Sequence, residues 1–463
     1  MLEKILNFGR KIIPKSIFNF FQPTYHWLLS AMACLWYGFP SNKLIVIGVT
    51  GTNGKSTTVN LIVKILEEAG FKIGLCSGIN FKISEDEWEN KTRMTMPGRF
   101  VLQKMLRKMV KANCKYAVIE VTSEGLKQNR GLGINFDVAV FTNLQPEHLE
   151  SHGGFEKYKK AKAKLFQSLE NSKKIYPVKC LQGKFNGARK IIISNLDDDY
   201  GQYFLKFKSD EKYGYEINAK RKTQNAKLQL KTQNYLKIIK AENVNQNINE
   251  TNFICQGKEF HLNLLGEFNV YNALAGICLG LSQGIDLEII KKALKKIKGI
   301  PGRMEKINEG QNFTVIIDHA HTPDAFELLY QTIQTIYPKE SKIISVFGSA
   351  GGIRDKGKRP MLGFIASKYS DFIILTNEDP YDTPPKEIIK DITEGFNKEK
   401  MILGKKYWEI LDRKEAIEKA LSLAQENDIV LILGKGCEPC IKIAKNKKIP
   451  WDDRKVVREA LGS

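Results

Sequence analysis

Short apolar runs alternate with longer amphipathic segments along most of this chain. The first pair is an apolar, β-branched run at 44–47 and a helical pattern at 59–66, separated by a glycine-rich turn. Further runs typical of buried strands lie at 116–121, 137–142 and 190–194. Strands that alternate with helices predict an α/β fold with a mostly parallel sheet.

After these strands come a polar region and two helices, and then a second series of strands and helices. Residues 200–262 are polar and predict edge strands and loops, and apolar helices are expected at 267–284 and 287–298. Gly299-Ile300-Pro301-Gly302 then breaks the pattern, which indicates a domain boundary. A second strand and helix series follows and predicts a Rossmann-like, doubly wound C-terminal domain, with strands at 313–318, 342–347, 371–376 and 428–433.

We expect the first 43 residues, which are rich in aromatic and basic side chains, to form a separate helical segment. Lys4, Arg10, Lys11 and Lys15 surround apolar residues there, and the stretch 27–39 carries no charge. This stretch is shorter than the ~20 residues that cross a bilayer. Two interpretations remain: helices packed on the first domain, or an interfacial helix on the membrane surface. The expected domains are therefore 1–43, 44–299 and 300–463.

Composition excludes some classes of protein. A net charge of +21 invites a nucleic-acid interpretation, but the lysines are spread along the chain without arginine and aromatic residues interleaved. We therefore expect no nucleic acid, and a positive field that suits anionic nucleotide substrates. The eight cysteines are scattered apart from Cys437 and Cys440, which favours reduced thiols in a cytosol over a zinc site.

The turn after the first strand has the composition of a phosphate-binding loop. It reads Gly48-Val49-Thr50-Gly51-Thr52-Asn53-Gly54-Lys55-Ser56-Thr57-Thr58. Gly48 lies one position too early for the common spacing, so the usable core runs from Gly51 to Ser56. Backbone N–H groups and the helix N-terminus would bind phosphate, Lys55 would reach the β- and γ-phosphates, and Ser56 would ligate Mg²⁺. The loop predicts ATP or GTP binding.

Polar loops follow several other strands. In the first domain Glu120 and His148 follow neighbouring strands and could complete metal coordination. In the second domain four polar loops are expected at one edge of the sheet, where open α/β sheets bind ligands. These loops begin at Asp318, Gly348, Thr376 and Gly434. The lysine-rich segment 158–166 would by itself be a solvated helix face.

These motifs together resemble the Mur ligases, and within that family the UDP-N-acetylmuramoyl-tripeptide synthetases. The matching stretches run in the family's order from about residue 44 to 460. They include Gly51-Thr52-Asn53-Gly54-Lys55, Thr122-Ser123 with Gln128 and Arg130, Phe141-Thr142-Asn143-Leu144 with His148, Ala161-Lys162, Asn269-Val270-Tyr271-Asn272-Ala273, Pro301-Gly302-Arg303-Met304-Glu305, Ala320-His321-Thr322-Pro323, Gly357-Lys358-Arg359-Pro360, and Gly434-Lys435-Gly436 with Glu438.

The resemblance implies an ATP-dependent amide-bond ligase of peptidoglycan synthesis. ATP would phosphorylate the terminal carboxylate of a UDP-MurNAc-dipeptide (L-Ala-D-Glu), and a free amino acid would attack the acyl phosphate. The enzyme would use two Mg²⁺ ions, be cytoplasmic and act as a monomer. Closure of the C-terminal domain would complete the site and exclude water.

The resemblance also implies roles for single residues. Lys55, Glu120, His148 and Lys162, the last carbamylated, would be catalytic. ATP would be held by Gly51, Thr52, Asn53, Gly54, Lys55, Ser56, Thr57, Asn272, Arg303, Asp318 and His321. The metal ions would be held by Ser56, Glu120, His148 and Lys162. Substrates would be held by Thr95, Thr122, Gln128, Arg130, Arg354, Asp379 and Glu438.

Two departures from the family pattern leave alternatives open. Residues 1–43 are too few for the family's separate UDP-binding domain, so a lipid-linked muramoyl acceptor and a folylpolyglutamate synthetase-like ligase remain alternatives. Diaminopimelate-adding members carry Asp-Asn-Pro-Arg where this chain has Glu378-Asp379-Pro380-Tyr381. The missing arginine removes a bidentate partner for a distal carboxylate, so the added amino acid stays open. A membrane-associated ATP-binding scaffold is disfavoured because Lys55, Glu120, His148 and Lys162 are all present.

Overall fold

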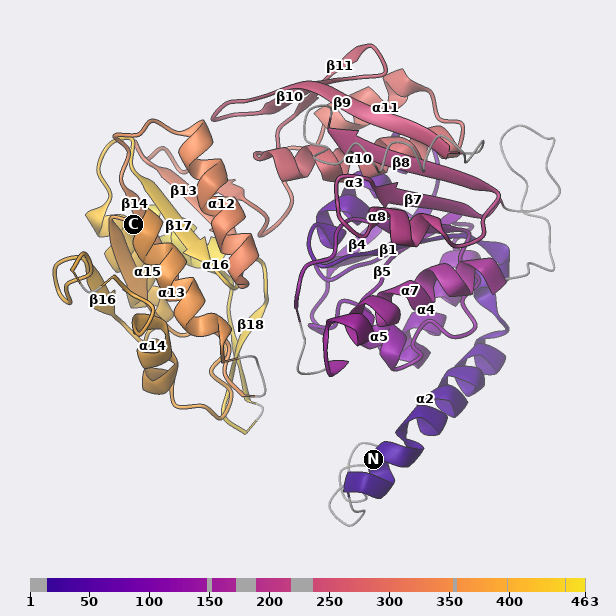
Figure 1. Ribbon diagram of the computed structural model, residues 1–463, viewed down its shortest axis with the longest axis horizontal. Coiled ribbons are helices and arrows are strands. Elements are labelled where there is room, and N and C mark those ends of the chain that lie inside the picture. The colour runs from indigo at the N-terminus through magenta and orange to yellow at the C-terminus, as the bar shows by residue number, and fades with distance from the viewer. Residues whose placement is uncertain are drawn as a thin grey trace. The chain divides into compact units, whose positions relative to one another are not determined.

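The computed structural model describes residues 15–147, 152–171, 189–217, 236–352, 356–397, 399–445 and 447–462. The chain folds into two compact units (Figure 1). The first holds the chain up to Lys240 together with Tyr271–Ala293, and the second holds Ala241–Val270 and the chain from Leu294 onward.

The larger sheet has a parallel centre. In the described part of the chain the strand order is β11-β10-β9-β8-β7-β6-β1-β5-β2-β3-β4. The strands from β8 to β2 in this order pair in parallel, whereas β3 and β4 at one end and β10 and β11 at the other pair antiparallel. Their bounds are β1 Ile45–Thr50, β2 Ile73–Cys76, β3 Asn80–Ile83, β4 Asp86–Glu89, β5 Tyr116–Glu120, β6 Val138–Phe141, β7 Ile191–Asn195, β8 Glu211–Ile217, β9 Leu236–Gln246, β10 Thr251–Cys255 and β11 Lys258–Leu262.

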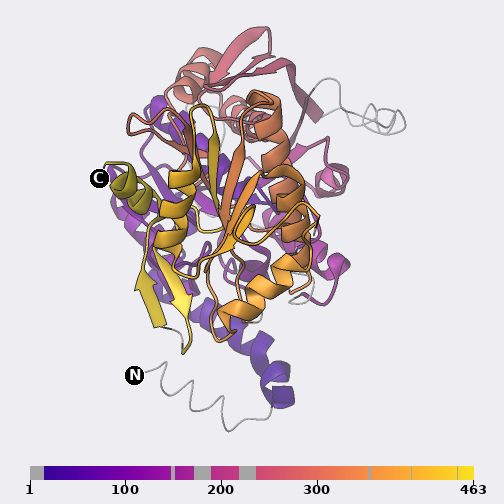
Figure 2. The same cartoon turned by 90° about the vertical axis from the view of Figure 1, so that its left-hand side faces the viewer.

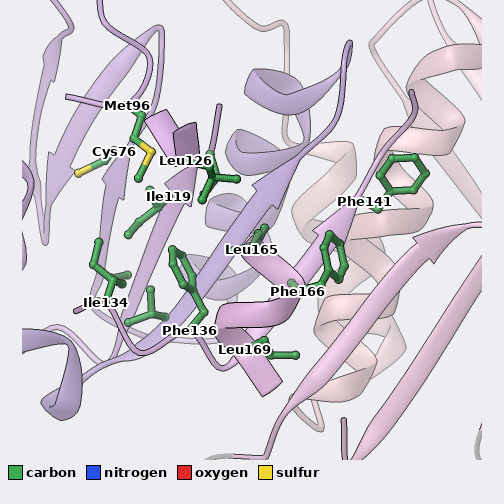
Figure 3. Packing of buried hydrophobic residues seen from close by; sticks show 14 of the residues in the cluster. Cys76, Met96, Ile119, Leu126, Ile134, Phe136, Phe141, Leu165, Phe166 and Leu169 are labelled. Carbon is green, nitrogen blue, oxygen red and sulfur yellow. The ribbon is translucent and has the colours of Figure 1, made fainter. Parts of the chain in front are cut away.

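Helices that cover this sheet bury apolar faces. Leu165, Phe166 and Leu169 of α7 pack with Phe136 and with Phe141 of β6 in one buried cluster (Figure 3). The cluster also draws on α4, α5 and α8. The helices are α2 Lys15–Tyr37, α3 Lys55–Glu68, α4 Arg99–Lys111, α5 Ser123–Lys127, α7 Phe155–Asn171, α8 Gly201–Leu205, α10 Glu267–Ser282 and α11 Leu287–Lys295, with a short 3₁₀ helix η1 at Pro40–Lys43.

The second sheet runs β12-β13-β17-β14-β15-β16 and is parallel from β13 to β16. Consecutive residues of β13 point to opposite faces: Ile316 joins a cluster with α12, α13 and α14, and Ile317 joins one with α15 and α16. A β18–β19 hairpin extends beyond the sheet (Figure 2). The bounds are β12 Glu305–Ile307, β13 Thr314–Asp318, β14 Ile343–Phe347, β15 Phe372–Leu375, β16 Tyr407–Glu409, β17 Ile429–Leu433, β18 Cys440–Ile443, β19 Lys447–Pro450, α12 Pro323–Ile336, α13 Lys358–Tyr369, α14 Pro385–Thr393, α15 Arg413–Leu423 and α16 Asp453–Leu461.

The predicted fold class is confirmed. The runs predicted as buried strands coincide, within one or two residues, with β5, β6 and β7 and with β13, β14, β15 and β17. Buried β-branched runs of this kind are typical of parallel strands covered on both faces. No helix among the described residues is both long enough and apolar enough to cross a bilayer.

Candidate functional site

The glycine-rich loop joins β1 to α3, as the sequence predicts. Gly54 precedes α3 with φ of 80°, and a Cβ there would lie 2.4 Å from Asn272 Oδ1. A Cβ on Gly51 would lie 1.9 Å from Thr142 Oγ1. Any larger residue at Gly51 or Gly54 would therefore clash with a neighbouring side chain, and only glycine fits without displacement. Asn272 of α10 also accepts a hydrogen bond from Thr58 Oγ1 at 3.1 Å, so this predicted ATP-binding residue lies beside the loop.

The chain after β6 fixes the shape of the loop. The Asn143 carbonyl accepts from Thr52 N at 2.9 Å, and Asn143 Oδ1 accepts from Asn53 N at 2.8 Å. Thr142 Oγ1 donates to the Asn53 carbonyl at 2.7 Å. Asn143 was not predicted as a site residue from the sequence. Its signals in the sequence were its position directly after a buried strand and its place in the stretch Phe141-Thr142-Asn143-Leu144 that resembles the family.

A carboxylate and a hydroxyl meet at the first turn of α3. Ser56 Oγ donates to the two carboxylate oxygens of Glu120 at 2.9 and 3.0 Å, and Gly78 N donates to Oε2 at 2.8 Å. Glu120 is buried, and Thr95 lies against the same side of Gly78. Oxygen donors beside a phosphate loop are the ligands that Mg²⁺ prefers. Ser56 and Glu120 therefore fit a magnesium ion.

Within the described residues, no group of three or more His, Cys, Asp or Glu side chains is arranged to hold a metal ion. His148, the other predicted ligand, lies outside the described residues, and so does Arg354. Among the described residues, the candidate metal ligands are therefore Ser56 and Glu120. Lys162 contacts the phosphate loop at the carbonyl of Gly51.

Lys162 lies inside the protein on α7, with 2% of its surface exposed. Its Nζ donates to the Gly51 carbonyl at 2.6 Å and lies 4.5 Å from the centre of the Tyr158 ring. Burial lowers the pKa of Lys162 well below the ordinary lysine value, and the nearby Lys55 lowers it further. Burial therefore favours the neutral form of this amine. Segment 158–166 is not the solvated face that its lysines suggest, because its apolar positions and Lys162 share one buried side.

The predicted acceptor-binding residues gather around α5. Thr122 caps this helix by accepting from Gly125 N at 3.1 Å. Arg130 Nη2 donates to Gln128 Oε1 at 2.8 Å, and Gln128 Nε2 donates to Glu124 Oε1 at 2.8 Å. A buried histidine that was not predicted from the sequence, His152, lies 3.2 Å from Ser123 Oγ through its Nε2.

In the second unit, Asp318 organises the loop after β13. Its carboxylate accepts from Met304 N at 2.7 Å and from Ala320 N at 2.6 Å. Burial raises the pKa of Asp318, while the charge of Arg303 lowers it. His321 follows in the same loop, and its carbonyl accepts from Lys358 Nζ at 2.8 Å. The predicted residues Arg303, Asp318 and His321 therefore belong to one local cluster.

The loops after β15 and β17 meet at a buried lysine. Lys435 Nζ donates to Asp379 Oδ1 at 2.9 Å and to Glu438 Oε2 at 2.7 Å. Lys435 has no exposed surface, and Glu378 beside it has a pKa raised by burial. The predicted substrate residues Asp379 and Glu438 are thus brought together, with Lys435 as a partner that was not selected from the sequence. The loop after β14 joins them, because Gly351 N donates to the Asp379 carbonyl at 2.8 Å.

The first sheet carries a phosphate-binding loop with oxygen ligands suited to Mg²⁺, and the second sheet has polar loops at one edge. These features define the class of nucleotide-dependent α/β enzymes. Two family models match the chain: the Mur ligase middle domain at residues 49–280, and the Mur ligase glutamate ligase domain at residues 302–436. The chain belongs to the Mur ligase family, and it is an ATP-dependent amide ligase of a family that typically uses Mg²⁺.

Individual relatives agree with this assignment. The chain is 38% identical over 447 residues to the UDP-N-acetylmuramyl-tripeptide synthetase of Roseiflexus sp. (strain RS-1), covering 94% of this chain and 81% of the relative. A solved UDP-N-acetylmuramoyl-L-alanyl-D-glutamate--2,6-diaminopimelate ligase is 29% identical with a TM-score of 0.56, covering 90% of this chain and 78% of that one. Mycobacterium tuberculosis folylpolyglutamate synthase has a TM-score of 0.62 at 14% identity, covering 88% and 91%, which shows a shared fold alone.

Proposed function

We propose that this ligase adds an amino acid to UDP-MurNAc-L-Ala-D-Glu in peptidoglycan precursor synthesis. The terminal carboxylate of the dipeptide attacks the γ-phosphorus of ATP, ADP leaves, and an acyl phosphate forms. The amine of the amino acid then attacks the acyl carbon, phosphate leaves, and the amine loses a proton. The observation that carries the proposal is the phosphate loop itself, where the buried amine of Lys162 donates to the carbonyl of Gly51 and Ser56 pairs with the buried carboxylate of Glu120.

The phosphate loop binds and orients ATP in this proposal. Gly51, Thr52, Asn53, Gly54, Ser56 and Thr57 would surround the phosphates with backbone and hydroxyl donors, and Lys55 would neutralise charge on the transferred phosphoryl group. Lys55 Nζ already lies at the loop, where it donates to the Thr52 carbonyl at 2.7 Å. Asn272 would support the loop from α10, and Arg303, Asp318 and His321 would contribute from the second unit.

Ser56 and Glu120 would hold one Mg²⁺ ion, and Lys162 with His148 would hold a second. Magnesium ions supply positive charge that stabilises the pentavalent phosphoryl group during transfer. For Lys162 this role requires carbamylation: Nζ attacks CO₂, the N–C bond forms and one proton is lost. The lowered pKa supports this step because only the neutral amine has the free electron pair.

The proposed substrate-binding residues form two groups, one for the muramoyl peptide and one for the incoming amino acid. Thr95, Thr122, Gln128 and Arg130 would hold the muramoyl peptide. Arg354, Asp379 and Glu438 would hold the incoming amino acid, with Asp379 and Glu438 supported by their shared ion pair to Lys435. We assign the ATP-binding domain to 44–299 and the C-terminal ligase domain to 300–463.

A second candidate acceptor is a lipid-linked muramoyl peptide. It is favoured by one observation, which is that Arg99 joins the acceptor loop to the N-terminal helix. Arg99 Nη2 donates to the Gln128 carbonyl at 2.7 Å and lies 2.8 Å from His26 Nδ1 of α2. Exposed apolar side chains on α2 would bring such an acceptor's lipid close to the loop. We propose that the enzyme is a cytoplasmic monomer with membrane-surface contact through residues 1–43.

Phosphate release from ATP and Mg²⁺ tests the proposal. The assay contains UDP-MurNAc-L-Ala-D-Glu and one amino acid from a panel that includes lysine, ornithine and diaminopimelate. We expect release that requires both the dipeptide substrate and one amino acid. Release that needs neither, or a product without a new amide bond, would refute the proposal. Release only with a lipid-linked acceptor would select the second candidate.

A further inference from the structure

The N-terminal helix α2 presents an apolar stripe to solvent. Tyr25, Leu28, Met32, Leu35 and Trp36 follow the i, i+3, i+7, i+10, i+11 spacing of one helix face, and all five are exposed. Leu35 is 69% exposed and Trp36 80%. Exposed apolar stripes of this kind mark interaction surfaces on soluble domains.

The opposite face of α2 is anchored to its own unit. Ser30 Oγ donates to the Asn129 carbonyl at 2.8 Å, and Cys34 Sγ donates to the Leu132 carbonyl at 3.2 Å. Gln103 Nε2 of α4 donates to Cys34 Sγ at 3.2 Å. The helix is therefore held in one rotational setting that turns the stripe outward. Figure 1 shows α2 extending beyond α4 and α5.

The charged side chains of α2 and of the neighbouring helix α4 are all basic. The sequence contains no acidic residue between Glu3 and Glu67, and Lys15 is the only charged residue of α2. The neighbouring helix α4 packs on α2 and has no acidic residue. It carries five cations, namely Arg99, Lys104, Arg107, Lys108 and Lys111.

The apolar stripe and the basic charge together favour an anionic membrane over a second copy of the chain as the partner of α2. A second copy of the chain docked through the stripe would bring two basic α2–α4 pairs together, which like-charge repulsion opposes. A bilayer with anionic headgroups complements both features, because it accepts tryptophan and leucine at the acyl boundary and lysine at the headgroups. We propose that α2 docks its apolar stripe onto an anionic membrane surface, with the exposed Lys104, Lys108 and Lys111 of α4 at the headgroups. This interaction does not depend on the reaction proposed above.

Vesicle flotation of the full chain tests the proposal. The vesicles are phosphatidylcholine with or without phosphatidylglycerol, at low and high salt. The test variant is Met32→Ser/Leu35→Ser/Trp36→Ser. Its matched control, Met361→Ser/Phe364→Ser/Leu403→Ser, removes three apolar side chains of similar exposure, 54%, 60% and 59%, from the second unit.

We expect wild type and control to bind the anionic vesicles, at least tenfold more weakly without phosphatidylglycerol and more weakly at high salt. We expect the test variant to bind at least tenfold more weakly than the control. Equal binding of the two variants, or no binding by wild type, would overturn the proposal. So would a dimer in sedimentation velocity that only the test variant loses, because the stripe would then be a contact between copies.

A second measurement does not depend on the folding of any variant. Brominated acyl chains quench only tryptophans that enter the bilayer, and α2 carries Trp27 and Trp36 of the chain's five. We expect a fall in wild-type fluorescence with brominated anionic vesicles relative to unbrominated ones. Unchanged fluorescence would overturn the proposal.

Discussion

Lys162 and Gly51 are 111 positions apart in the chain, and Lys162 Nζ donates a hydrogen bond to the Gly51 carbonyl at 2.6 Å. This bond joins α7 to the phosphate loop. A charged lysine would be costly in so buried a position, whereas a neutral amine that donates one hydrogen bond is tolerated. The neutral form, which burial favours, is also the form whose electron pair can attack CO₂ in the proposed carbamylation.

Replacement of this lysine tests its part in turnover. We expect Lys162→Ala to lower kcat by at least about a hundredfold, because the variant would lose the carbamate that we propose as a ligand of Mg²⁺ during phosphoryl transfer. A small added carboxylate such as formate should restore part of the rate. Lys160→Ala, an exposed position on the same helix, is the control and should leave kcat unchanged. Near-normal turnover of Lys162→Ala would remove Lys162 from the mechanism.

The lowered pKa of Lys162 also predicts a pH-dependent stability. The folded-state pKa lies below that of the unfolded chain, so between the two values the unfolded state binds the additional proton. Stability therefore rises with pH in this window, by up to about 1.4 kcal/mol per pH unit. We expect Lys162→Met to be more stable than wild type at pH 7.

Chemical denaturation in CO₂-free buffer from pH 7 to 10 measures this difference. The difference in the free energy of unfolding between Lys162→Met and wild type should decrease as the pH approaches the ordinary lysine pKa of about 10.4. Lys160→Met removes an exposed lysine and should show no such trend. A gap that stays constant with pH would mean that Lys162 is charged in the folded protein.

The phosphate loop offers a test with two glycines. Gly54 and Gly70 have nearly the same φ, 80° and 83°, but only a Cβ on Gly54 meets an obstacle, Asn272 Oδ1 at 2.4 Å. Both alanine variants carry the cost of a positive φ, about 1–2 kcal/mol. We expect only Gly54→Ala to weaken ADP binding, by tenfold or more in calorimetry. Equal affinities for the two variants would show that the loop does not bind nucleotide at this position.

Glu120 gives the corresponding test of the metal site. Glu120→Gln keeps a hydrogen-bond acceptor for Ser56 and Gly78 but loses the negative charge that attracts Mg²⁺. The Mg²⁺ concentration for half-maximal phosphate release should rise at least tenfold. Glu85→Gln, an exposed carboxylate in the same unit, should not change it. If Glu120→Gln needs the same Mg²⁺ concentration as wild type for half-maximal phosphate release, the metal ion is bound by other ligands.

Much of the architecture follows from local sequence patterns. Buried parallel strands are short β-branched runs, and the glycine-rich turn lies between the first such run and a helix, so β1, the loop and α3 could be predicted directly. Glu120 could be selected because it ends a strand. Its partner Gly78 could not, because their contact depends on β2 lying beside β5 in the sheet.

Other contacts of the site depend on the folded chain in the same way. Asn143 and His152 act through neighbours that lie 90 and 29 positions away. The burial of Lys162 reverses what a lysine-rich helix indicates by itself, and the motif around it was the only signal for its position. Lys435 lies within a glycine-rich motif that was recognised, but its ion pair with Asp379 joins the loops after β15 and β17, which only the folded sheet brings together.

The fate of one oxygen atom tests the proposed reaction directly. The terminal carboxylate of UDP-MurNAc-L-Ala-D-Glu is labelled with ¹⁸O, and turnover is run with ATP, Mg²⁺ and the amino acid that supports phosphate release. Transfer through an acyl phosphate predicts that each released phosphate carries one carboxylate oxygen, seen by mass spectrometry, and that the peptide gains an amide bond. Released phosphate without ¹⁸O would contradict an acyl-phosphate ligase acting on this dipeptide.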